Sequence, residues 1–405
     1  MKILVLNAGS SSVKYQLIIP EDAKVLAKGV VERIGLAGAV LTHKSHNKPE
    51  IKLAGEILDH RVAIEYVLTI LLSPNHGVLK DKSEIDAIGH RVVHGGEAFS
   101  DSVLINDDVI REMTKCIDFA PLHNPPNLKG IAAAKALLPN VPQVGVFDTA
   151  FHQSMPDYAY VYGIPYILYK RYGIRRYGFH GTSHRYVAER AVKILNISVN
   201  EELKMITCHL GNGSSIAAIK NGNSIDTSMG FTPLEGLLMG TRTGDMDPAI
   251  LLHVMTKEEL TSSEMNIMLN KHSGILGISG LSSDMREIED NYYTNEKARL
   301  AMNVFVYRIK KYIGAYAAAM GGVDVIVFTA GIGENSPFIR ESACKGLEFL
   351  GVKLDKDKNE QTRNDEGIIS KNDSKVKVMV IPTNEELVIA IDTAQIVTKL
   401  QEQLV

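Results

Sequence analysis

Two hydrophobic patterns alternate along the chain: short runs of consecutive apolar residues, and longer stretches in which apolar residues return at every third or fourth position. Short runs rich in β-branched residues predict strands, and the longer pattern predicts helices. The predicted strands are Ile3–Leu6, Ile85–Ile88, Gln143–Phe147, Met205–His209, Val323–Thr329 and Val376–Ile381. Strands that alternate with helices in this way predict an α/β fold.

One long helix is predicted from about Glu296 to Met320. Apolar residues recur through it at helical spacing, and they are Leu300, Val304, Ile309, Ile313, Tyr316 and Met320. Gly321 and Gly322 follow directly and are expected to end the helix. We expect this helix to be a buried packing element.

The chain has 405 residues, which is long for a single hydrophobic core and predicts two domains. The polar stretches 196–202 and 355–375 are expected to be surface connections. No flexible linker separates two units, so we expect the domains to meet across a cleft. Residues 3–17 and 207–221 share a strand, a Gly-Ser-Ser segment and a second apolar run, which predicts two related lobes. A chance match over so few residues is the alternative.

Composition excludes several classes of protein. The formal net charge of -3 leaves no basic face for nucleic acid. The three cysteines are far apart and form no CxxC pair, so neither a disulfide framework nor a zinc knuckle is expected. The apolar run after Lys2 is short for a signal peptide, and no run of about 18 apolar residues predicts a membrane span. We therefore expect a cytoplasmic protein without a membrane or nucleic-acid partner.

Three predicted strands lead into loops of small residues. The first loop, NAGSSS, offers backbone N–H groups and the hydroxyls of Ser10 and Ser12 to an anion, and Lys14 adds a positive charge. An ordinary hairpin with a solvent-facing lysine is the alternative, and the absence of GxxxxGK[ST] excludes a P-loop NTPase. The other two loops are HLGNGSS and FTAGIGENS; the GxG of the latter is incomplete as a dinucleotide fingerprint because Ser336 replaces the third glycine. Three such loops favour a nucleotide site in which two bind phosphates and one binds adenosine.

Two arginines and one histidine are candidates for phosphoryl chemistry. Arg91 follows a predicted strand, and Arg242 lies in the loop GTRTGDMDP. A planar guanidinium can bind two phosphoryl oxygens at once. His180 and His184 have the i,i+4 spacing of zinc ligands on one face of a helix. Gly181 argues against a helix that begins early enough to carry both histidines. We therefore favour a hydrogen bond from His180 to a substrate or phosphoryl oxygen, with His184 as a structural residue.

Three further polar residues lie next to predicted elements. Asp148 ends the strand Gln143–Phe147, Glu385 begins an apolar helix, and Asn7 directly follows the first strand. Functional side chains of α/β proteins often lie at such strand ends. Mg²⁺ keeps most of its waters and needs few protein ligands, so these residues form a candidate magnesium site. For Glu385 the alternative is a carboxylate that only stabilises the helix dipole.

Several segments, spread from Lys2 to the last helix, together resemble the acetate kinase family. They are NAGSSSVKYQL, GHRVVHGGE, APLHNPPN, VFDTAFHQSMP, YGFHGTSHRYV, HLGNGSS, GFTPLEGLLMGTRTGDMDP, FTAGIGENS and IPTNEE. The resemblance implies the two-lobed, actin-like fold of acetate and sugar kinases, heat-shock chaperone ATPases and actin, in which two ribonuclease-H-like domains flank a cleft. It implies an N-terminal lobe of residues 1–148 and 386–405, with the first phosphate loop and part of the acid site. Residues 149–385 would form the C-terminal lobe, with the second phosphate loop and the adenosine site.

The resemblance also implies an activity, the reversible transfer of the γ-phosphoryl group of ATP to acetate, with Mg²⁺ or with Mn²⁺ in its place. It implies catalytic roles for Arg91, Asp148, His180 and Arg242, and it implies that the metal is held by Asn7 and Glu385. The implied nucleotide contacts are Ser10, Ser12, Lys14, His209, Gly211, Asn212, Gly213, Asp284, Met285, Arg286, Gly331, Ile332, Gly333 and Asn335. The implied acid-binding residues are Arg91, Val93, Leu122, Phe179 and Pro233. A homodimer is implied as well.

Three alternatives stay open on these residues. A propionate or butyrate kinase of the same family has a substrate longer by one or two methylene groups, a difference worth about 1–3 kcal/mol in an apolar pocket. An actin-like or chaperone-like ATPase that binds a protein partner would need the glycine loops, but not two arginines facing a small-acid pocket. A zinc hydrolase built on His180 and His184 would need stoichiometric zinc.

Overall fold

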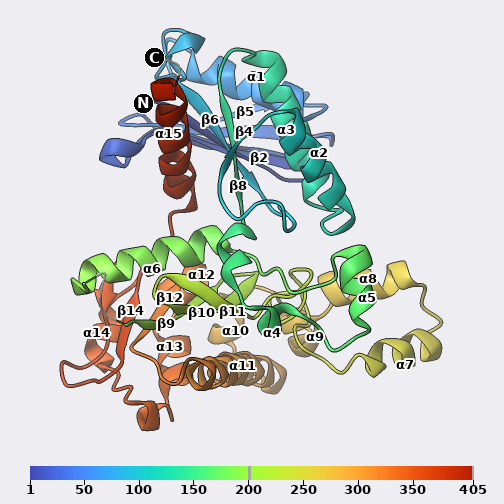
Figure 1. Ribbon diagram of the computed structural model, residues 1–405, viewed down its shortest axis with the longest axis vertical. Coiled ribbons are helices and arrows are strands. Elements are labelled where there is room, and N and C mark those ends of the chain that lie inside the picture. Colours follow the sequence, from blue (N-terminus) through green and yellow to red (C-terminus); the bar gives the residue numbers. More distant parts are fainter. Residues whose placement is uncertain (199–201, 404–405) are drawn as a thin grey trace. The chain divides into compact units, whose positions relative to one another are not determined.

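The computed structural model in Figure 1 describes residues 1–198 and 202–403. The chain divides into two compact units: unit 1 contains Met1–Phe151 and Asn384–Val405, and unit 2 contains His152–Thr383. The resemblance implies lobe boundaries at 148/149 and 385/386, whereas the structure assigns residues 149–151 and 384–385 to unit 1. Glu385 is therefore part of the same unit as Asn7.

Unit 1 is built on an eight-stranded sheet with the order β5-β4-β3-β2-β1-β6-β8-β7. Its strands are β1 (Ile3–Ala8), β2 (Ser12–Ile19), β3 (Lys24–Glu32), β4 (Ala39–Ser45), β5 (Ile51–Gly55), β6 (Ala87–Val92), β7 (Val103–Leu104) and β8 (Gln143–Phe147). Its helices are α1 (His60–Leu71), α2 (Asp107–Lys115), α3 (Asn124–Leu137) and α15 (Glu385–Gln403). The strands β1, β6 and β8 are parallel, and the other neighbouring pairs are antiparallel.

Alternate residues of β1 pack on opposite faces of this sheet. Leu4, Leu6 and Ala8 are buried with residues of α1 and α3, whereas Ile3 and Val5 are buried with residues of α15. This division follows from the two-residue period of a strand. Both faces of β1 are consequently covered, as its almost continuously apolar sequence requires.

The approach of α15 to β6 depends on one glycine. A Cβ atom at Gly89 would lie 2.5 Å from a methyl carbon of Ile389 and 2.5 Å from the hydroxyl oxygen of Thr393. Real Cβ atoms do not approach other atoms so closely, so only glycine lets the helix lie this near the strand. The first residue of α15 is thereby held close to the end of β6.

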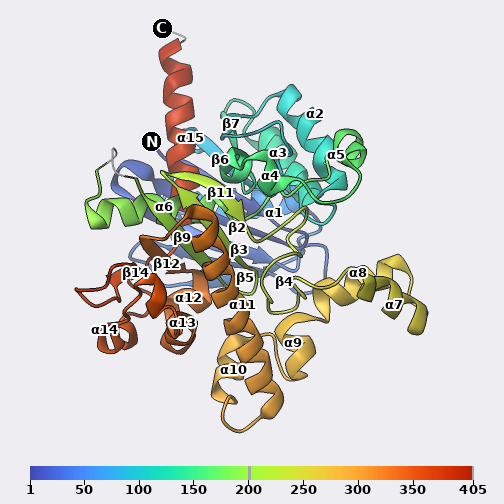
Figure 2. The same cartoon turned by 60° about the horizontal axis from the view of Figure 1, so that its bottom comes forward.

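Unit 2 is built on a six-stranded sheet with the order β11-β10-β9-β12-β14-β13. Its strands are β9 (Lys204–Leu210), β10 (Ser214–Lys220), β11 (Asn223–Thr227), β12 (Val325–Thr329), β13 (Gly367–Ile368) and β14 (Lys377–Val380). Its helices are α4 (Asp157–Tyr160), α5 (Tyr166–Tyr172), α6 (Gly181–Leu195), α7 (Ala249–Lys257), α8 (Ser262–Lys271), α9 (Gly274–Ser279), α10 (Met285–Asp290), α11 (Glu296–Met320), α12 (Ala330–Asn335), α13 (Pro337–Cys344) and α14 (Lys356–Gln361). In Figure 1 α6 and α11 lie on opposite faces of this sheet, and Figure 2 shows α7 and α8 extending away from it.

The two sheets share a five-stranded core. Its order is β3-β2-β1-β6-β8 in unit 1 and β11-β10-β9-β12-β14 in unit 2. In both units, three consecutive antiparallel strands are followed by two strands parallel to the first of them. The α/β fold with two ribonuclease-H-like cores is thus confirmed.

The structure corrects the alignment of the two glycine hairpins. The first Gly-Ser-Ser segment lies in the turn between β1 and β2, whereas the second already enters β10. Counted from the turn, Asn7 and Lys14 form the second cross-strand pair of the first hairpin, and His209 and Ser215 form the second pair of the other. Lys14 therefore corresponds to Ser215 in the repeat.

Several predicted elements can be compared with the observed ones. The long helix Glu296–Met320 and the strand Gln143–Phe147 are confirmed at both ends. The strand predicted at Ile85–Ile88 is wrong in position, because a 3₁₀ turn reaches Glu84 and β6 begins only at Ala87. Segment 355–375 contains α14 and β13 and is not a plain connection. Of the connection predicted at 196–202, residues 199–201 lie outside the described residues.

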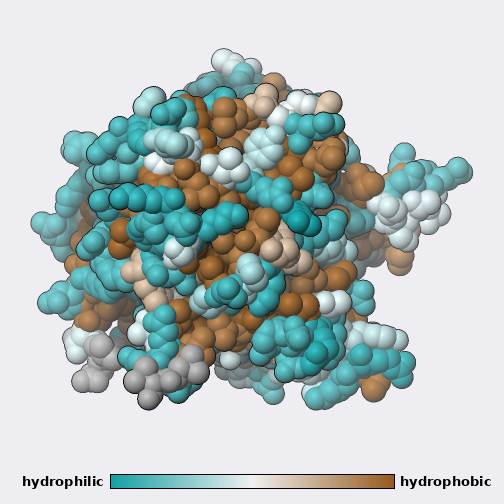
Figure 3. Space-filling view, turned by 90° about the horizontal axis from the view of Figure 1, so that it is seen from above, coloured by the Kyte–Doolittle hydropathy of each residue, from teal (hydrophilic) through white to brown (hydrophobic). Residues whose placement is uncertain are grey.

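The surface carries scattered apolar side chains. On the face drawn in Figure 3, hydrophobic residues lie among hydrophilic ones over much of the area. In unit 2, Tyr158 is 86% exposed and Leu252 is 70% exposed. Apolar atoms form part of the surface of any folded chain, so these exposures alone do not identify a binding surface. Within the part of the chain that the structure describes, no helix combines the length and apolar character needed to cross a membrane.

Candidate active site

Polar residues end three parallel strands of unit 1 on the face that α15 covers. Asn7, Arg91 and Asp148 each come two positions after a residue that packs against α15, so they lie on the same face. Those earlier residues are Val5, Gly89 and Val146. Because parallel strands end at one edge of a sheet, the three polar side chains share that edge, and α15 begins there with Glu385.

Two carboxylates hold the guanidinium of Arg91. Nη2 donates to Asp148 Oδ2 at 2.6 Å, Nε donates to Asp148 Oδ1 at 3.2 Å, and Nε lies 3.6 Å from Glu385 Oε2. Attraction to Asp148 raises the pKa of Arg91 above its usual range, so this arginine stays charged. Burial raises the pKa of Asp148 and of Glu385, and attraction to Arg91 opposes both shifts. One guanidinium faces two carboxylates here, so a further cation would be favoured nearby.

The turn after β1 is closed by backbone groups and leaves small side chains at the surface. The Gly9 N–H donates to the Ser12 carbonyl at 2.8 Å, and His60 Nε2 donates to the Gly9 carbonyl at 2.7 Å. Ser10 is exposed and Ser12 is half-buried. The turn can therefore present backbone and hydroxyl groups to a ligand without first rearranging.

Lys14 lies beside Asn7, because the two residues are cross-strand partners on β2 and β1. Cross-strand partners project from the same face of a sheet. Both residues and Glu386 contribute to the lining of a cavity of about 280 Å³ in unit 1. The ammonium group of Lys14 therefore lies on the same side of the sheet as the Arg91 centre.

Two buried asparagines of α3 hold the neighbouring loops. Asn127 Nδ2 donates to the Ala8 carbonyl at 2.8 Å, and its Oδ1 accepts from the Val93 N–H at 3.1 Å. Asn124 Oδ1 accepts from the His94 N–H at 3.2 Å, and its Nδ2 donates to the His94 carbonyl at 3.0 Å. These amides tie the end of β1 to the segment after β6. Sequence analysis missed both; the signal was the polar start, NPPN, of a helix that must pack on a sheet.

The four apolar residues predicted to wall the acid pocket come from both units. Val93 in unit 1 and Phe179 in unit 2 are buried, and Pro233 in unit 2 is partly buried. Leu122 is 60% exposed, so unit 1 does not itself bury this side chain. A common pocket for these residues stays a prediction.

In unit 2, the Arg242 guanidinium and the His180 imidazole converge on the turn after β9. The Gly211 N–H donates to the Gly213 carbonyl at 3.1 Å and closes the turn. A Cβ atom at Gly213 would lie 3.5 Å from Arg242 Nη1 and 3.5 Å from His180 Nε2. Arg242 Nη1 also donates to the Pro233 carbonyl at 3.1 Å. An anion with several oxygens beside Gly213 would meet both side chains.

Asn212 connects this turn to the loop of Arg242. Its carbonyl accepts from the Gly240 N–H at 3.0 Å. A Cβ atom at Gly240 would lie 1.9 Å from Asn212 Oδ1. A larger residue at position 240 would therefore force the Asn212 side chain out of its observed position.

His180 has an uncommon backbone conformation directly before α6. Its φ is +57°, in the left-handed region, where residues with a Cβ are found mainly at turns and functional sites. The helix begins at the very next residue, Gly181, and includes His184 in its first turn. His180 therefore lies outside the helix, so the expectation that the helix does not begin early enough to carry both histidines is confirmed.

His180 and His184 are joined by a serine hydroxyl. Ser215 Oγ lies 3.0 Å from His180 Nδ1 and 2.7 Å from His184 Nε2. The other nitrogen of His184, Nδ1, lies 2.7 Å from Thr207 Oγ1. The His180 ring also stacks on His209, with 4.1 Å between centroids. Ser215 and Thr207 were missed by sequence analysis; their signal is the occurrence of polar residues in strands that are otherwise apolar.

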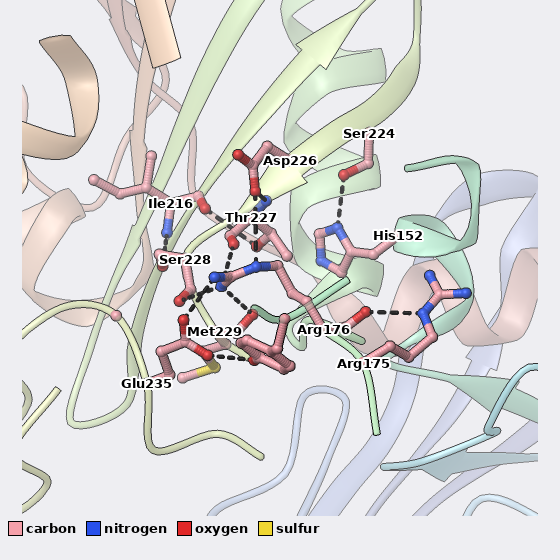
Figure 4. A network of polar contacts seen from close by, with 12 residues as sticks. His152, Arg175, Arg176, Ile216, Ser224, Asp226, Thr227, Ser228, Met229 and Glu235 are labelled. Atoms are coloured by element: carbon pink, nitrogen blue, oxygen red, sulfur yellow. Dashed lines mark hydrogen bonds and ion pairs between the residues drawn. The ribbon is translucent and has the colours of Figure 1, made fainter. Parts of the chain in front are cut away.

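Arg176 fixes the segment that leads to Pro233. Its Nη1 donates to the carbonyls of residues 227–229 at 2.9, 3.1 and 3.2 Å, and its Nη2 donates to Glu235 Oε1 at 2.6 Å (Figure 4). The Tyr162 hydroxyl donates to the second oxygen of Glu235. Sequence analysis did not assign Arg176, since nothing in its neighbourhood along the chain identifies acceptors more than fifty residues away.

A cavity of about 1020 Å³ adjoins the second glycine turn within unit 2. The predicted residues in its lining are Gly211, Asn212, Asp284, Met285, Arg286, Gly331, Ile332 and Asn335. Gly333 is buried instead, and its carbonyl accepts from Arg340 at 2.9 Å. Glu289 and Arg363 also line the cavity and were not predicted. The volume is at the upper end of the range for small-molecule sites.

Comparison with known proteins shows similarity over nearly the whole chain. The profile of the acetokinase family matches residues 2–391. A curated acetate kinase from Thermoanaerobacterium thermosaccharolyticum is 62% identical over 403 residues, which cover 99% of this chain and 100% of that protein. The crystal structure of Porphyromonas gingivalis acetate kinase has a TM-score of 0.94 at 53% identity and covers 98% of this chain and 99% of its own. The crystal structure of a propionate kinase from Francisella tularensis has a TM-score of 0.90 at 44% identity, with 97% and 99% covered.

Proposed function

Since the chain belongs to the acetokinase family, we propose that it transfers the γ-phosphoryl group of ATP to acetate, giving ADP and acetyl phosphate, and that it catalyses the reverse reaction. The structural observation that carries the proposal is the Arg91 guanidinium, which Asp148 and Glu385 hold at the edge of three parallel strands. A guanidinium fixed in this way can bind the carboxylate of a small acid in one orientation.

The proposed reaction needs no general base. A carboxylic acid such as acetic acid has a pKa between about 4 and 5, so acetate is already ionised at neutral pH. The protein has to offset the repulsion between two anions and hold them in line. Guanidinium, ammonium and imidazole N–H groups suit that task, and no serine or cysteine nucleophile is required.

We assign roles to the site residues on this basis. Arg91 binds the carboxylate of acetate, Asp148 positions Arg91, and Arg242 and His180 stabilise the transferring phosphoryl group. The phosphates are bound by Ser10, Ser12 and Lys14 of unit 1 and by Gly211, Asn212 and Gly213 of unit 2, with His209 behind the second turn. Adenosine occupies the cavity of about 1020 Å³, where the Asp284–Arg286 ion pair and the backbone at Gly331 are available to it.

The residues at the edge of unit 1 fit a hydrated magnesium ion. Asn7 offers an amide oxygen and Glu385 a carboxylate oxygen, both of which are ligands that Mg²⁺ prefers. Within residues 1–198 and 202–403, no three His, Cys, Asp or Glu side chains are gathered as a metal-binding group. We therefore propose that Asn7 and Glu385 hold the ion through its waters, with Mn²⁺ as a substitute. The bound ion would neutralise charge on the ATP phosphates.

A propionate kinase is the second candidate, and one observation favours it. The solved propionate kinase from Francisella tularensis superposes on this chain with a TM-score of 0.90. One methylene group in an apolar pocket is worth about 1–3 kcal/mol, or about 10- to 200-fold in kcat/KM. We expect a graded preference for acetate over propionate and butyrate.

We further propose that the protein is a cytoplasmic homodimer. Three buried free cysteines, Cys116, Cys208 and Cys344, are compatible with a reducing compartment. The homodimer is what the resemblance to acetate kinases implies. Light scattering of the purified protein should give twice the monomer mass, and a monomer mass at micromolar concentration would contradict the dimer.

Trapping of acyl phosphate tests the function and the substrate together. Hydroxylamine converts acyl phosphates to hydroxamates, which can be measured with ATP and with acetate, propionate or butyrate in parallel. We expect hydroxamate with each acid and the highest kcat/KM with acetate. No hydroxamate from any of the acids would refute the kinase activity, and a higher kcat/KM with propionate would favour the second candidate.

A further inference from the structure

A line of hydrogen bonds beneath α6 ends at His180. The Thr207 hydroxyl oxygen lies 2.7 Å from His184 Nδ1, His184 Nε2 lies 2.7 Å from Ser215 Oγ, and Ser215 Oγ lies 3.0 Å from His180 Nδ1. The side chains of Thr207, His184 and Ser215 have no exposed area. Polar groups buried so completely have to satisfy their hydrogen bonds within the protein.

The fold explains why polar residues gather at this place. Ile206 and Cys208 of β9 pack into the apolar core on the α11 side, so Thr207 and His209 project to the other face, beneath α6. Ser215 is the cross-strand partner of His209 and projects to the same face. In the internal repeat Ser215 has the position that Lys14 has in unit 1. The same position in the fold therefore has a polar side chain in both units.

Counting hydrogens gives the line a direction. Burial, together with two neighbouring imidazoles, lowers the pKa of His184 well below its usual value, so His184 is neutral, with one N–H and one lone pair. Among the described residues, His184 Nδ1 is the only hydrogen-bond acceptor within reach of the Thr207 hydroxyl. Thr207 therefore donates to Nδ1, and the hydrogen of His184 lies on Nε2, from which it is donated to Ser215. The Ser215 hydroxyl in turn donates to His180 Nδ1.

The opposite direction would leave one group unsatisfied. If His184 carried its hydrogen on Nδ1, Thr207 would accept that hydrogen bond, and the hydrogen of its own buried hydroxyl would have no acceptor. Leaving a buried donor unpaired costs more than an ordinary hydrogen bond contributes. The Thr207 hydroxyl is therefore the group that sets the direction of the whole line.

We propose that Thr207, His184 and Ser215 are positioning residues that hold His180 in the tautomer with its hydrogen on Nε2. This nitrogen and Arg242 Nη1 both lie next to the Gly213 turn, so in this tautomer two N–H donors are available to one ligand there. In the other tautomer a lone pair on Nε2 would face that space and repel a phosphoryl oxygen. The role of the donor rests on the proposed function, whereas the tautomer itself is a property of the protein alone.

The first test is the ¹⁵N NMR spectrum of the whole protein labelled in its histidine rings. Comparison with a His180→Gln variant identifies the His180 signals. At neutral pH we expect Nε2 to appear as a protonated nitrogen and Nδ1 as an unprotonated one. A hydrogen on Nδ1, or on both nitrogens, would overturn the proposal. Because this measurement needs no turnover, a protein that forms no acyl phosphate but shows the Nε2–H tautomer would refute the proposed function alone.

The second test changes the group that sets the direction. Thr207→Val keeps the side-chain shape and removes the hydroxyl, and Thr207→Ser is the matched control that keeps it. In Thr207→Val we expect His180 to become a mixture of tautomers and kcat to fall about fivefold, the factor that one hydrogen bond represents, with KM unchanged. Thr207→Ser should restore both the spectrum and kcat. A wild-type spectrum in Thr207→Val would overturn the proposal; if that variant does not fold, Ser215→Ala removes the final donor and gives the same readouts.

Discussion

Replacement of Asp148 by asparagine removes the charge that fixes Arg91 and leaves the shape of the side chain almost unchanged. Asp148 Oδ2 accepts from Arg91 Nη2 at 2.6 Å, and Oδ1 accepts from Nε at 3.2 Å. In the Asp148→Asn variant one of these oxygens becomes an NH₂ group, which would face a guanidinium that has only donors. The Asp148 side chain is 2% exposed, so water can restore little of the lost interaction.

The size of the effect follows from this burial. Removal of one partner from a buried, hydrogen-bonded ion pair costs about 3–5 kcal/mol, which would correspond to about 10²- to 10⁴-fold if all of it acted on the rate. Glu385 Oε2, at 3.6 Å from Arg91 Nε, stays in place as a second carboxylate and reduces the loss. We therefore expect kcat/KM for acetate to fall by about 10²-fold, the lower limit of that range.

The assay is hydroxamate formation as a function of acetate and of Mg²⁺. If Asp148 acts by positioning Arg91, the Mg²⁺ concentration that gives half-maximal rate should not change. Asp373→Asn is the matched control, because Asp373 accepts from Lys353 at the same distance of 2.6 Å but its side chain is 67% exposed, and this variant should keep wild-type activity. Wild-type kcat/KM in Asp148→Asn, or a loss explained by a higher Mg²⁺ requirement, would refute the positioning role.

Three further predictions follow from the same structure. Arg242→Ala removes a donor beside Gly213 and should lower kcat roughly 10²-fold in the hydroxamate assay; near-normal turnover would contradict its assigned role. Gly89→Ala places a Cβ 2.5 Å from atoms of α15 and should lower the free energy of unfolding by about 1–3 kcal/mol. Gly314→Ala has open space around it in α11 and should raise the free energy of unfolding by about 0.5–1 kcal/mol. Urea unfolding measures both, and a reversed order would show that the packing argument is mistaken. Burial lowers the pKa of His90 to about 4 in the folded protein, below its value of 6.5 in the unfolded chain, so the unfolded state binds a proton first as pH falls. The free energy of unfolding should therefore keep the His90 contribution above about pH 6.5 and decrease toward pH 4. His90→Gln should show a shallower decrease with pH. An unchanged slope of the free energy of unfolding against pH would mean that another group is responsible.

Local periodicity predicts some elements well. The helix Glu296–Met320 and the strand Gln143–Phe147 depend mainly on their own residues, and both are observed with the predicted bounds. The same reasoning identifies Asn7 and Asp148 as residues at strand ends, since the apolar run before each of them is short and unambiguous. Their arrangement around Arg91 then follows from the parallel order of three strands.

Contacts between distant segments could not be predicted in this way. The line from Thr207 to His180 depends on the register of the β9–β10 hairpin and on where α6 begins. The sequence alignment matched the two hairpins by their Gly-Ser-Ser segments, and its register was wrong because the first segment lies in the turn whereas the second already enters β10. Helix α6 begins only after His180, as Gly181 indicates, but the left-handed conformation of His180 is not apparent from the sequence.

Buried polar residues form a second group that the sequence does not reveal. Asn124 and Asn127 are buried and Arg176 is partly buried, and their partners include backbone groups far along the chain. Nothing in local propensity distinguishes such a residue from a solvated one. Burial provides the distinction, and burial depends on the complete fold.

The most direct test of the proposed reaction follows the oxygen atoms of acetate. The protein is incubated with ATP, Mg²⁺ and acetate labelled with ¹⁸O at both oxygens, and the acetyl phosphate formed is examined by ³¹P NMR. Direct attack of the carboxylate on the γ-phosphorus makes an ¹⁸O atom the bridging oxygen between the acetyl carbon and the phosphorus. An ¹⁸O atom bound to phosphorus shifts the phosphorus signal. We predict acetyl phosphate with this bridging label; no acetyl phosphate, or acetyl phosphate without ¹⁸O bound to phosphorus, would contradict the proposed reaction.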